Sequence, residues 1–275
     1  MANLRAKGIW GRLLVWLLLI PVTLAAAAGP VWVVAIYALL WIGLSSYEYL
    51  SLYLKPFKFY HGLFILGPVI VWIYPLFPDF LPLGCYLFGA ILIQLILWLF
   101  FFPSRYRLLI PLLLIPFYLG LLPLHFVLLK ITSLEQGLGY AWMIFPFVMN
   151  WVNDTAAYFT GRSLGKTPLC SKLSPAKTVE GLIGGLIFTV AFGIGFGLLF
   201  LPEQPWWFNV ILSVGVWGAG TAGDLLESGI KRERRVKNTS VILAGHGGFL
   251  DRVDSLLFAA PLYFYLYMML EKVCV

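Results

Sequence analysis

Nine apolar stretches dominate the sequence, each close to the roughly 20 residues that an α-helix needs to cross the hydrocarbon core of a bilayer. Of the 275 residues, 61% are hydrophobic and only 11% are charged, whereas about 25% of the residues in an average soluble domain are charged. No water-soluble core could bury so much apolar surface. The sequence therefore predicts an all-α, polytopic integral membrane protein. The expected spans are residues 13–28, 30–54, 60–77, 81–102, 107–129, 139–160, 181–201, 206–228 and 253–270.

The first apolar stretch follows Arg5, Lys7 and Arg12 and in this respect resembles a secretory signal peptide. The next stretch begins almost at once, at Pro30. This short spacing favours a retained first helix over cleavage after residues 25–28.

The basic residues predict the orientation of the chain, because cytoplasmic loops carry an excess of Lys and Arg. With the N-terminus in the cytoplasm, 17 of the 19 Lys and Arg residues fall on the cytoplasmic side, and only Lys130 and Lys272 fall outside. We therefore expect a multi-pass protein of the cell inner membrane, with a cytoplasmic N-terminus and an external C-terminus.

The loops divide the sequence into two expected domains. Residues 1–138 hold the first five spans, joined by short connections, and residues 139–275 hold the last four. Two long cytoplasmic segments, at about 161–180 and 229–252, carry ten basic residues, and Asp and Glu residues occur in the same segments. Catalytic chemistry is therefore expected in the C-terminal domain, on its cytoplasmic face.

Acidic side chains at membrane depth indicate function, because each costs roughly 2.5 to 3.5 kcal/mol on insertion scales. Helical spacing places the polar residues of the sixth span in one stripe and those of the eighth span on one face at its cytoplasmic end. The alternative is that these groups form hydrogen bonds that hold neighbouring helices together. The candidates are Asn150, Asn153 and Asp154 on the sixth span, and Asp224, Glu227 and Ser228 on the eighth.

The segment at residues 231–254, with the sequence KRERRVKNTSVILAGHGGFLDRVD, combines basic, glycine and acidic residues. Gly247 and Gly248, preceded by His246, allow the backbone to approach an anion closely and to turn N–H groups toward phosphate oxygens. Asp251 and Asp254 suit a hard cation such as Mg²⁺ that bridges phosphates. The alternative is a solvated basic loop with a glycine turn and with acidic residues at a helix N-terminus.

A second cytoplasmic element, KLSPAKTVEG, occupies residues 172–181. Ser174 as N-cap and Pro175 at the first helical position would start a helix there. The free N–H groups of that helix, with Lys177 and Thr178, could hold a phosphate. A plain capped helix start explains the same residues.

The glycine pattern at residues 218–223 matches GxGxxG, but it lies within an apolar helix and follows no strand, so it lacks the context of a dinucleotide site. Close packing of helices through small residues explains it better. His61 and His125 are isolated near helix ends and are expected to be structural. Three widely spaced cysteines indicate neither a disulfide framework nor a zinc site.

Together these motifs resemble the signature of the phosphatidate cytidylyltransferases, also called CDP-diacylglycerol synthases. The likeness is carried by SGIKR at 228–232, Lys237-Asn238, HGGFLDRVD at 246–254, residues 153–161, the SPxKTxEG element at 174–181, and GDLxES at 223–228. It covers roughly the C-terminal half. The N-terminal half is similar only in being helical.

The resemblance implies transfer of the cytidylyl group of CTP to phosphatidic acid, which yields CDP-diacylglycerol and pyrophosphate for phospholipid biosynthesis. It implies that Asp224 and Asp251 hold one Mg²⁺ ion, or Mg²⁺ together with a second cation. The expected partners are CTP, phosphatidic acid entering from the inner leaflet, the bilayer and a second copy in a homodimer, with no nucleic acid. The implied catalytic residues are Asp224, Asp251, Lys231, Arg232, Lys237 and Arg252, and the implied substrate-binding residues are Asn153, Asp154, Ser174, Lys177, Thr178, Glu180, Glu227, Ser228, Asn238, His246, Gly247, Gly248 and Asp254.

Two positions depart from the family pattern, which usually has Asp in place of Asn238 and Pro in place of Ala244. A diverged paralogue that uses CTP with another lipid phosphate or a polyprenol substrate is therefore an alternative. A membrane transporter is an alternative of a different class, since intramembrane carboxylates often mark ion paths. A transporter favours charges near the midplane and related repeats in the two halves, and the sequence shows neither feature.

The orientation predicts how the native cysteines react with an impermeant thiol reagent applied to intact cells. Cys274 is expected to be labelled because it lies on the external face, and Cys170 is expected to be spared because it lies in a cytoplasmic segment. Cells permeabilised before labelling provide the control, in which both should react. Labelling of Cys170 with protection of Cys274 would reverse the predicted topology.

Overall fold

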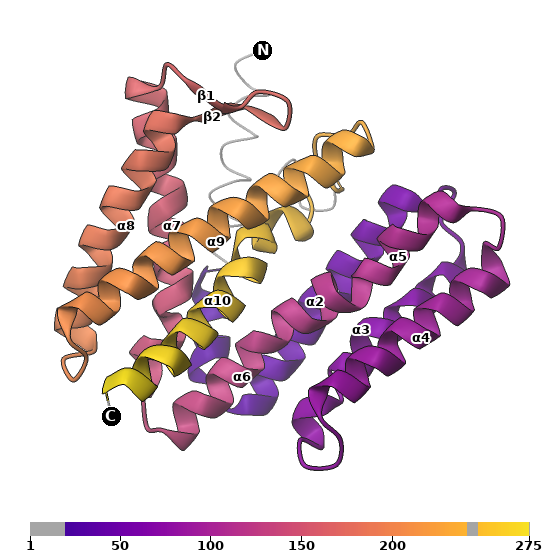
Figure 1. The fold of residues 1–275 in the computed structure, drawn as a ribbon, viewed down its shortest axis with the longest axis horizontal. Coiled ribbons are helices and arrows are strands. Elements are labelled where there is room, and N and C mark those ends of the chain that lie inside the picture. The colour runs from indigo at the N-terminus through magenta and orange to yellow at the C-terminus, as the bar shows by residue number, and fades with distance from the viewer. Residues whose placement is uncertain (1–19, 241–246, 275) are drawn as a thin grey trace. The chain divides into compact units, whose positions relative to one another are not determined.

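The computed structural model describes residues 20–240 and 247–274, and this part of the chain is helical apart from one short hairpin (Figure 1). Its contacts divide the chain into two units. Unit 1 comprises Met1–Ile131 and Asn238–Arg252, and unit 2 comprises Thr132–Lys237 and Val253–Val275. Residues 238–252, which the sequence groups with the C-terminal helices, thus pack with the N-terminal ones.

Unit 1 is a bundle of helices interrupted by short irregular turns. Residues 20–28 form the described part of its first helix. The later elements are α2 (Val31–Tyr53), a 3₁₀ segment (Phe59–Ile65), α3 (Leu66–Val71), a 3₁₀ turn (Tyr74–Leu76), α4 (Leu83–Phe101), a second 3₁₀ turn (Tyr106–Leu108), α5 (Leu109–Ile115), a π-helical turn (Pro116–Leu121) and α6 (Leu122–Glu135), whose end belongs to unit 2.

Proline residues interrupt several apolar helices of unit 1. Pro68 has no N–H group, so the carbonyl oxygen of Phe64, four residues earlier, loses its usual helical partner. The buried side chain of Gln94 on α4 replaces that partner, with its Nε2 atom 2.6 Å from the Phe64 oxygen. A neighbouring helix therefore satisfies the broken backbone, as an apolar environment requires.

Lys130, one of the two basic residues outside the predicted cytoplasmic set, is a buried residue of α6 and not part of a loop. Its Nζ atom donates a hydrogen bond of 3.0 Å to the carbonyl oxygen of Ala27, near the end of the first described helix. A cation is favourable at that position because the C-terminal carbonyl groups of a helix carry partial negative charge. Packing within unit 1 thus accounts for this exception.

Unit 2 contains the remaining helices and the hairpin, which joins α7 to α8 (Figure 1). The elements are α7 (Gly139–Leu164), β1 (Pro168–Cys170), β2 (Ser174–Thr178), α8 (Val179–Phe200), α9 (Trp206–Glu233) and α10 (Leu250–Cys274), which belongs to unit 2 from Val253 onward. The strands are antiparallel, with Pro168 opposite Thr178 and Cys170 opposite Ser174. The expectation of an all-α chain therefore holds except for this hairpin.

The prediction that a helix starts at Ser174 and Pro175 was wrong, because both residues lie in β2 and the helix begins at Val179. A residue before proline is disfavoured in the α region, which suits an extended Ser174. Thr178 is the actual N-cap, and its Oγ1 atom accepts a hydrogen bond of 3.1 Å from the N–H of Gly181. The signal for a capped helix was therefore correct in kind but four residues early.

Glycines bring the helices of unit 2 into close contact. A Cβ atom at Gly181 of α8 would lie 2.8 Å from the carbonyl oxygen of Ala157 on α7, and one at Gly185 would lie 2.4 Å from Oδ1 of Asn153. On α9, a Cβ atom at Gly220 would lie 2.5 Å from Oδ1 of Asn150. These contacts confirm helix packing as the role of the glycines at positions 181, 185 and 220.

Six of the described helical segments are long and apolar enough to cross a membrane: Val31–Tyr53, Phe59–Leu76, Leu83–Phe101, Tyr106–Glu135, Val179–Phe200 and Leu250–Lys272. Together with the helical content, they support a membrane protein with a helical fold. The helices α7 and α9 coincide with the sixth and eighth expected spans but are not among these six segments. The count of nine spans therefore stays a prediction.

Substitution of Gly181 by alanine tests the contact between α7 and α8. We expect Gly181→Ala to lower the free energy of unfolding by about 1 to 3 kcal/mol, because the new methyl group meets backbone atoms that cannot move aside easily. Gly195→Ala is the matched control on the same helix, since a Cβ atom there has no neighbour within 4 Å. Thermal unfolding in detergent measures both, and equal midpoints would contradict the close contact.

Candidate functional site

The centre of the candidate site in unit 2 is an ion pair between Lys177 and Asp224. Lys177 lies near the end of β2 and Asp224 lies on α9, so the hairpin and the helix each supply one charge. The two side chains keep 28% and 31% of their surface exposed. Both charged groups are therefore accessible to a ligand from the solvent.

Two residues at the start of α8 support the hairpin that carries Lys177: Glu180 in the first turn and the N-cap Thr178. The carboxylate of Glu180 accepts hydrogen bonds from the backbone N–H groups of Lys166 and Thr167 at 3.1 to 3.2 Å. Thr178 caps the helix, as described above. Glu180 and Thr178, both expected to bind substrate, therefore act in this structure as supports for the turn beside Lys177.

Two further carboxylates lie within electrostatic reach of Asp224. Asp154 comes from α7 and Asp254 from α10, and the three aspartates repel one another while Lys177 opposes the charge on Asp154. Asp254 is buried, and its Oδ1 atom accepts a hydrogen bond of 2.7 Å from the N–H of Ser255. Three helices thus bring carboxylates together near Lys177 and Lys231, and a cation would relieve the repulsion between them.

Glu227 and Lys231 form a second ion pair on α9, four residues apart. The Glu227 side chain is fully buried and that of Lys231 is 11% exposed. A buried carboxylate requires such a partner, and removal of one member of a buried pair is strongly destabilising. Lys231, expected from sequence to contact phosphate, is therefore held by a carboxylate in this structure.

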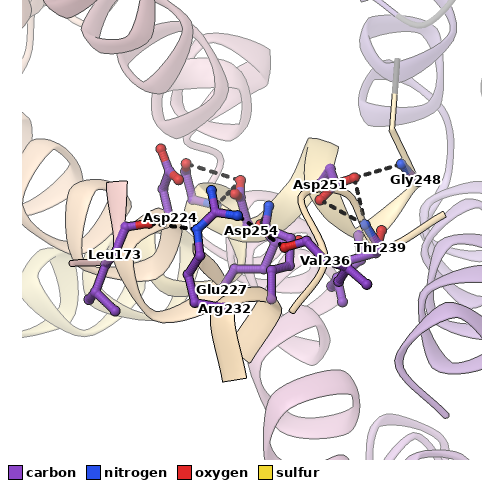
Figure 2. A network of polar contacts seen from close by, with 12 residues as sticks. Leu173, Asp224, Glu227, Arg232, Val236, Thr239, Gly248, Asp251 and Asp254 are labelled. Atoms are coloured by element: carbon purple, nitrogen blue, oxygen red, sulfur yellow. Dashed lines mark hydrogen bonds and ion pairs between the residues drawn. The ribbon is translucent and has the colours of Figure 1, made fainter. Parts of the chain in front are cut away.

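Arg232 joins the end of α9 to the hairpin. Its Nε atom donates to the carbonyl oxygen of Leu173 and its Nη1 atom donates to that of Val236, both at 3.1 Å (Figure 2). Leu173 lies in the turn between β1 and β2. Arg232, also expected to contact phosphate, uses these two donors to connect the two segments.

Unit 1 holds Asp251, the other aspartate expected to bind a metal. The N–H of Gly248 donates to Oδ2 of Asp251 at 2.7 Å, and the N–H of Thr239 donates to the same oxygen at 3.1 Å (Figure 2). Gly247 has a φ of 81°, in the region that favours glycine. The glycine turn does bring its backbone to an anion, but at Gly248 that anion is a carboxylate of the same chain.

Glu48, which was not predicted from the sequence, lies on α2 and contacts the same segment. Its side chain is fully buried and accepts four hydrogen bonds, from the hydroxyl groups of Thr239 and Ser240 and the N–H groups of Phe249 and Leu250. One signal was present, because Glu48 is the only acidic residue in the apolar stretch 30–54. An intramembrane carboxylate indicates a function or a specific partner.

Other expected site residues occupy less specific positions. Asn153 and Ser228 are buried in unit 2, Lys237 and Asn238 are exposed, and Arg252 is partly buried. Ser174 faces Cys170 in the hairpin. Positions 244 and 246 lie outside the described residues, so the structure does not test the roles expected there.

The carboxylates suit a cation that completes its coordination with ligand oxygens. Within residues 20–240 and 247–274, no group of three or more His, Cys, Asp or Glu side chains is arranged to hold a metal ion. Mg²⁺ is usually bound through one or two carboxylates together with substrate phosphates, and not by a cage of protein ligands. Asp224 fits that mode, because in the described structure only Lys177 bonds to its carboxylate, through Oδ2.

A cavity of about 540 Å³ lies against α7 and α8 in unit 2. Its lining is mostly apolar and includes Trp151, Val152 and Phe159 from α7 and Phe188 from α8. Thr155, the residue after Asp154, also lines it. The cavity therefore runs along the same helix that contributes a carboxylate to the site.

The Cytidylyltransferase family matches residues 10–270 of this chain. Several curated relatives of this chain are named phosphatidate cytidylyltransferase. The one from Bacillus subtilis strain 168 is 38% identical over 149 residues, which cover 54% of each chain. The one from Haemophilus influenzae Rd is 39% identical over 158 residues, which cover 56% of this chain and 54% of the relative.

A third relative so named, from Aquifex aeolicus VF5, is 38% identical over 139 residues, which cover 50% of this chain and 51% of the relative. The chain thus spans about half the length of the relatives it matches. The family match, in contrast, includes both the helices of unit 1 and the carboxylates of unit 2. On that match, the chain belongs to the cytidylyltransferase family.

Proposed function

We propose that this protein transfers the cytidylyl group of CTP to phosphatidic acid, forming CDP-diacylglycerol and releasing pyrophosphate. Family membership and the names of three relatives support this activity. The observation that carries it is the accessible Lys177–Asp224 pair, with Asp154 and Asp254 within electrostatic reach. Such a site combines a group that attracts phosphate with carboxylates that attract its counter-cation.

The proposed chemistry makes few demands on side chains as acids or bases. A phosphate monoester carries a charge of about −1.5 to −2 at neutral pH, so the attacking oxygen of phosphatidic acid requires no general base. The phosphate oxygen forms a bond to the α-phosphorus of CTP, and the bond from that phosphorus to the departing pyrophosphate breaks. The protein must therefore align the two phosphates and neutralise their charge, and Lys177 is placed to do so.

The proposal includes Mg²⁺, with Asp224 and Asp251 each as a ligand. Bound Mg²⁺ would neutralise the triphosphate and stabilise the departing pyrophosphate. Asp224 presents a carboxylate that is 31% exposed and shared with Lys177. Asp251 presents one whose Oδ2 atom already accepts two N–H groups, which fixes its direction. Lys177 would exchange its contact with Asp224 for a phosphate oxygen when the cation arrives.

The lipid substrate and the orientation complete the proposal. The apolar cavity along α7 and α8 is of the size and character that an acyl chain requires, and its lining includes Trp151 and Thr155 of the helix that carries Asp154. We propose nine membrane spans with the N-terminus in the cytoplasm, so that the charged segments face CTP in the cytoplasm. Phosphatidic acid would then enter from the inner leaflet, and two copies would form a homodimer.

Purified protein incubated with labelled CTP, phosphatidic acid and Mg²⁺ is expected to yield a lipid-soluble cytidine product. Asp224→Asn and Asp251→Asn should each reduce turnover at least 100-fold, because each removes a formal charge from a proposed cation ligand; a chelator should stop the reaction. Glu203→Gln, at an exposed carboxylate in the turn before α9, is the control that should keep full activity. Near-normal turnover by either aspartate variant at limiting Mg²⁺ would exclude that residue as a ligand.

The second candidate is a diverged paralogue that transfers cytidylyl groups to another lipid phosphate or to a polyprenol. Asn238, where the family usually has Asp, favours it. Its exposed side chain can accept a substitution without repacking.

Asn238→Asp distinguishes the two candidates. If the protein acts on phosphatidic acid, the restored carboxylate should lower the Mg²⁺ concentration required for half-maximal rate, because a charge adds to cation affinity. The neighbouring Lys237 is retained and supplies the balancing charge. A rate with phosphatidic acid that is unchanged or reduced at every Mg²⁺ concentration would favour the paralogue.

A further inference from the structure

Glu48 is a buried carboxylate of unit 1 whose two oxygens accept four hydrogen bonds. It lies on α2 with none of its side-chain surface exposed. Burial of an isolated carboxylate is very costly, so a buried carboxylate that remains charged requires several donors. The four groups that donate to Glu48 all come from residues 239–250, which are 191 to 202 positions away in the sequence.

The geometry is symmetric. Oε1 accepts from the hydroxyl of Ser240 at 2.6 Å and from the N–H of Phe249 at 2.9 Å. Oε2 accepts from the hydroxyl of Thr239 at 3.0 Å and from the N–H of Leu250 at 2.9 Å. Each oxygen thus binds one group before position 241 and one after position 248. Glu48 therefore holds together two flanks, residues 239–240 and 247–251, which the intervening residues separate along the chain.

The two N–H groups are donors at the start of α10, which begins at Leu250. The first N–H groups of a helix have no partner within the helix and carry partial positive charge, so a carboxylate is favourable there. Glu48 supplies that carboxylate from another helix. Its contact requires glycine at position 248, where a Cβ atom would lie 2.2 Å from Oε2 of Glu48 and 2.1 Å from Oγ1 of Thr239.

The same flanks also determine the direction of Asp251. Its carboxylate accepts the N–H groups of Thr239 and Gly248, one from each flank. Thr239 is therefore bonded to Glu48 through its hydroxyl group and to Asp251 through its backbone. A change in how Glu48 holds the flanks must change the donors that orient Asp251.

We propose that Glu48 is a positioning residue for Asp251: by joining both flanks, it fixes the direction in which the Asp251 carboxylate meets a divalent cation. The inference rests on the proposed function, in which Asp251 is a Mg²⁺ ligand. On this proposal α2, a helix of the N-terminal half, contributes to cation affinity through Glu48. If Glu48 only capped α10, its substitution would lower the unfolding temperature. Any loss of cation affinity would then be no larger than the loss of stability explains.

Glu48→Gln tests the proposal, because it keeps the size of the side chain but replaces one acceptor oxygen with an NH₂ group that faces donors. We expect the Mg²⁺ concentration for half-maximal rate to rise at least tenfold, with the KM for phosphatidic acid within twofold of the original value. A second readout is independent of turnover: the Mg²⁺ concentration that half-maximally raises the unfolding temperature should rise by a similar factor.

Gln94→Ala is the stability-matched control. It removes another buried hydrogen bond of unit 1, to the carbonyl oxygen of Phe64, and leaves the two flanks untouched. It should lower the unfolding temperature with Mg²⁺ affinity unchanged. Equal shifts in Mg²⁺ affinity for Glu48→Gln and Gln94→Ala, or no shift for Glu48→Gln, would overturn the proposal and leave Glu48 as a helix cap.

Ser240→Ala decides the question if Glu48→Gln does not fold. It removes one of the four donors and keeps the carboxylate, so we expect a threefold to fivefold rise in the Mg²⁺ requirement; an unchanged requirement would overturn the proposal. Absence of cytidylyl transfer by the unsubstituted protein would instead refute the proposed function. In that case the Mg²⁺ dependence of the unfolding temperature still tests Glu48.

Discussion

Carboxylates inside an apolar chain must find donors or cations, and this requirement organises both units of the protein. In unit 1, Glu48 and Asp251 collect hydroxyl and N–H groups from the flanks of one segment. In unit 2, Asp224 and Glu227 each pair with a lysine. Because buried surroundings weaken screening, the contacts of Glu48 and the Glu227–Lys231 pair are stronger than they would be in water, whereas the Lys177–Asp224 pair is about a third exposed and remains open to solvent. The positions of the remaining site residues follow from them.

Backbone groups face the same requirement as the charges. Gln94 satisfies the carbonyl oxygen left without a partner by Pro68, and Lys130 satisfies a carbonyl oxygen near the end of the first described helix. In unit 2, glycines on α8 and α9 bring helices close enough to contact polar side chains and backbone oxygens of α7. An apolar protein thus uses a small number of polar side chains, each for a specific unsatisfied group.

The assignment of polar residues divides into supporting groups and groups that remain accessible. Thr178, Glu180 and Arg232 are bonded to backbone atoms of the hairpin and its surroundings. Lys177 and Asp224, in contrast, bond to each other and keep about a third of their surface exposed. Family motifs contain both kinds of residue, because a catalytic group and the turn that holds it are equally necessary. Only the contacts distinguish the two roles.

The sequence by itself determined the helical membrane architecture, the approximate bounds of the helices, the family and the aspartates of the candidate site. These features follow from the lengths of apolar runs and from motifs of residues close together in the chain. Both can be recognised in the sequence without knowledge of the tertiary contacts. The start of α8 was misplaced because Ser174 and Pro175 suit both a helix N-terminus and an extended strand, and pairing with Cys170 selected the strand. Only the tertiary structure revealed the partnership of Glu48 with Thr239, Ser240 and α10, and the engagement of Lys231 by Glu227. The partnership of Glu48 joins segments 191 to 202 residues apart, so it leaves no pattern in the local sequence. The i, i+4 spacing of Glu227 and Lys231 is visible in the sequence, but the burial that commits Lys231 to this pair is set by tertiary packing.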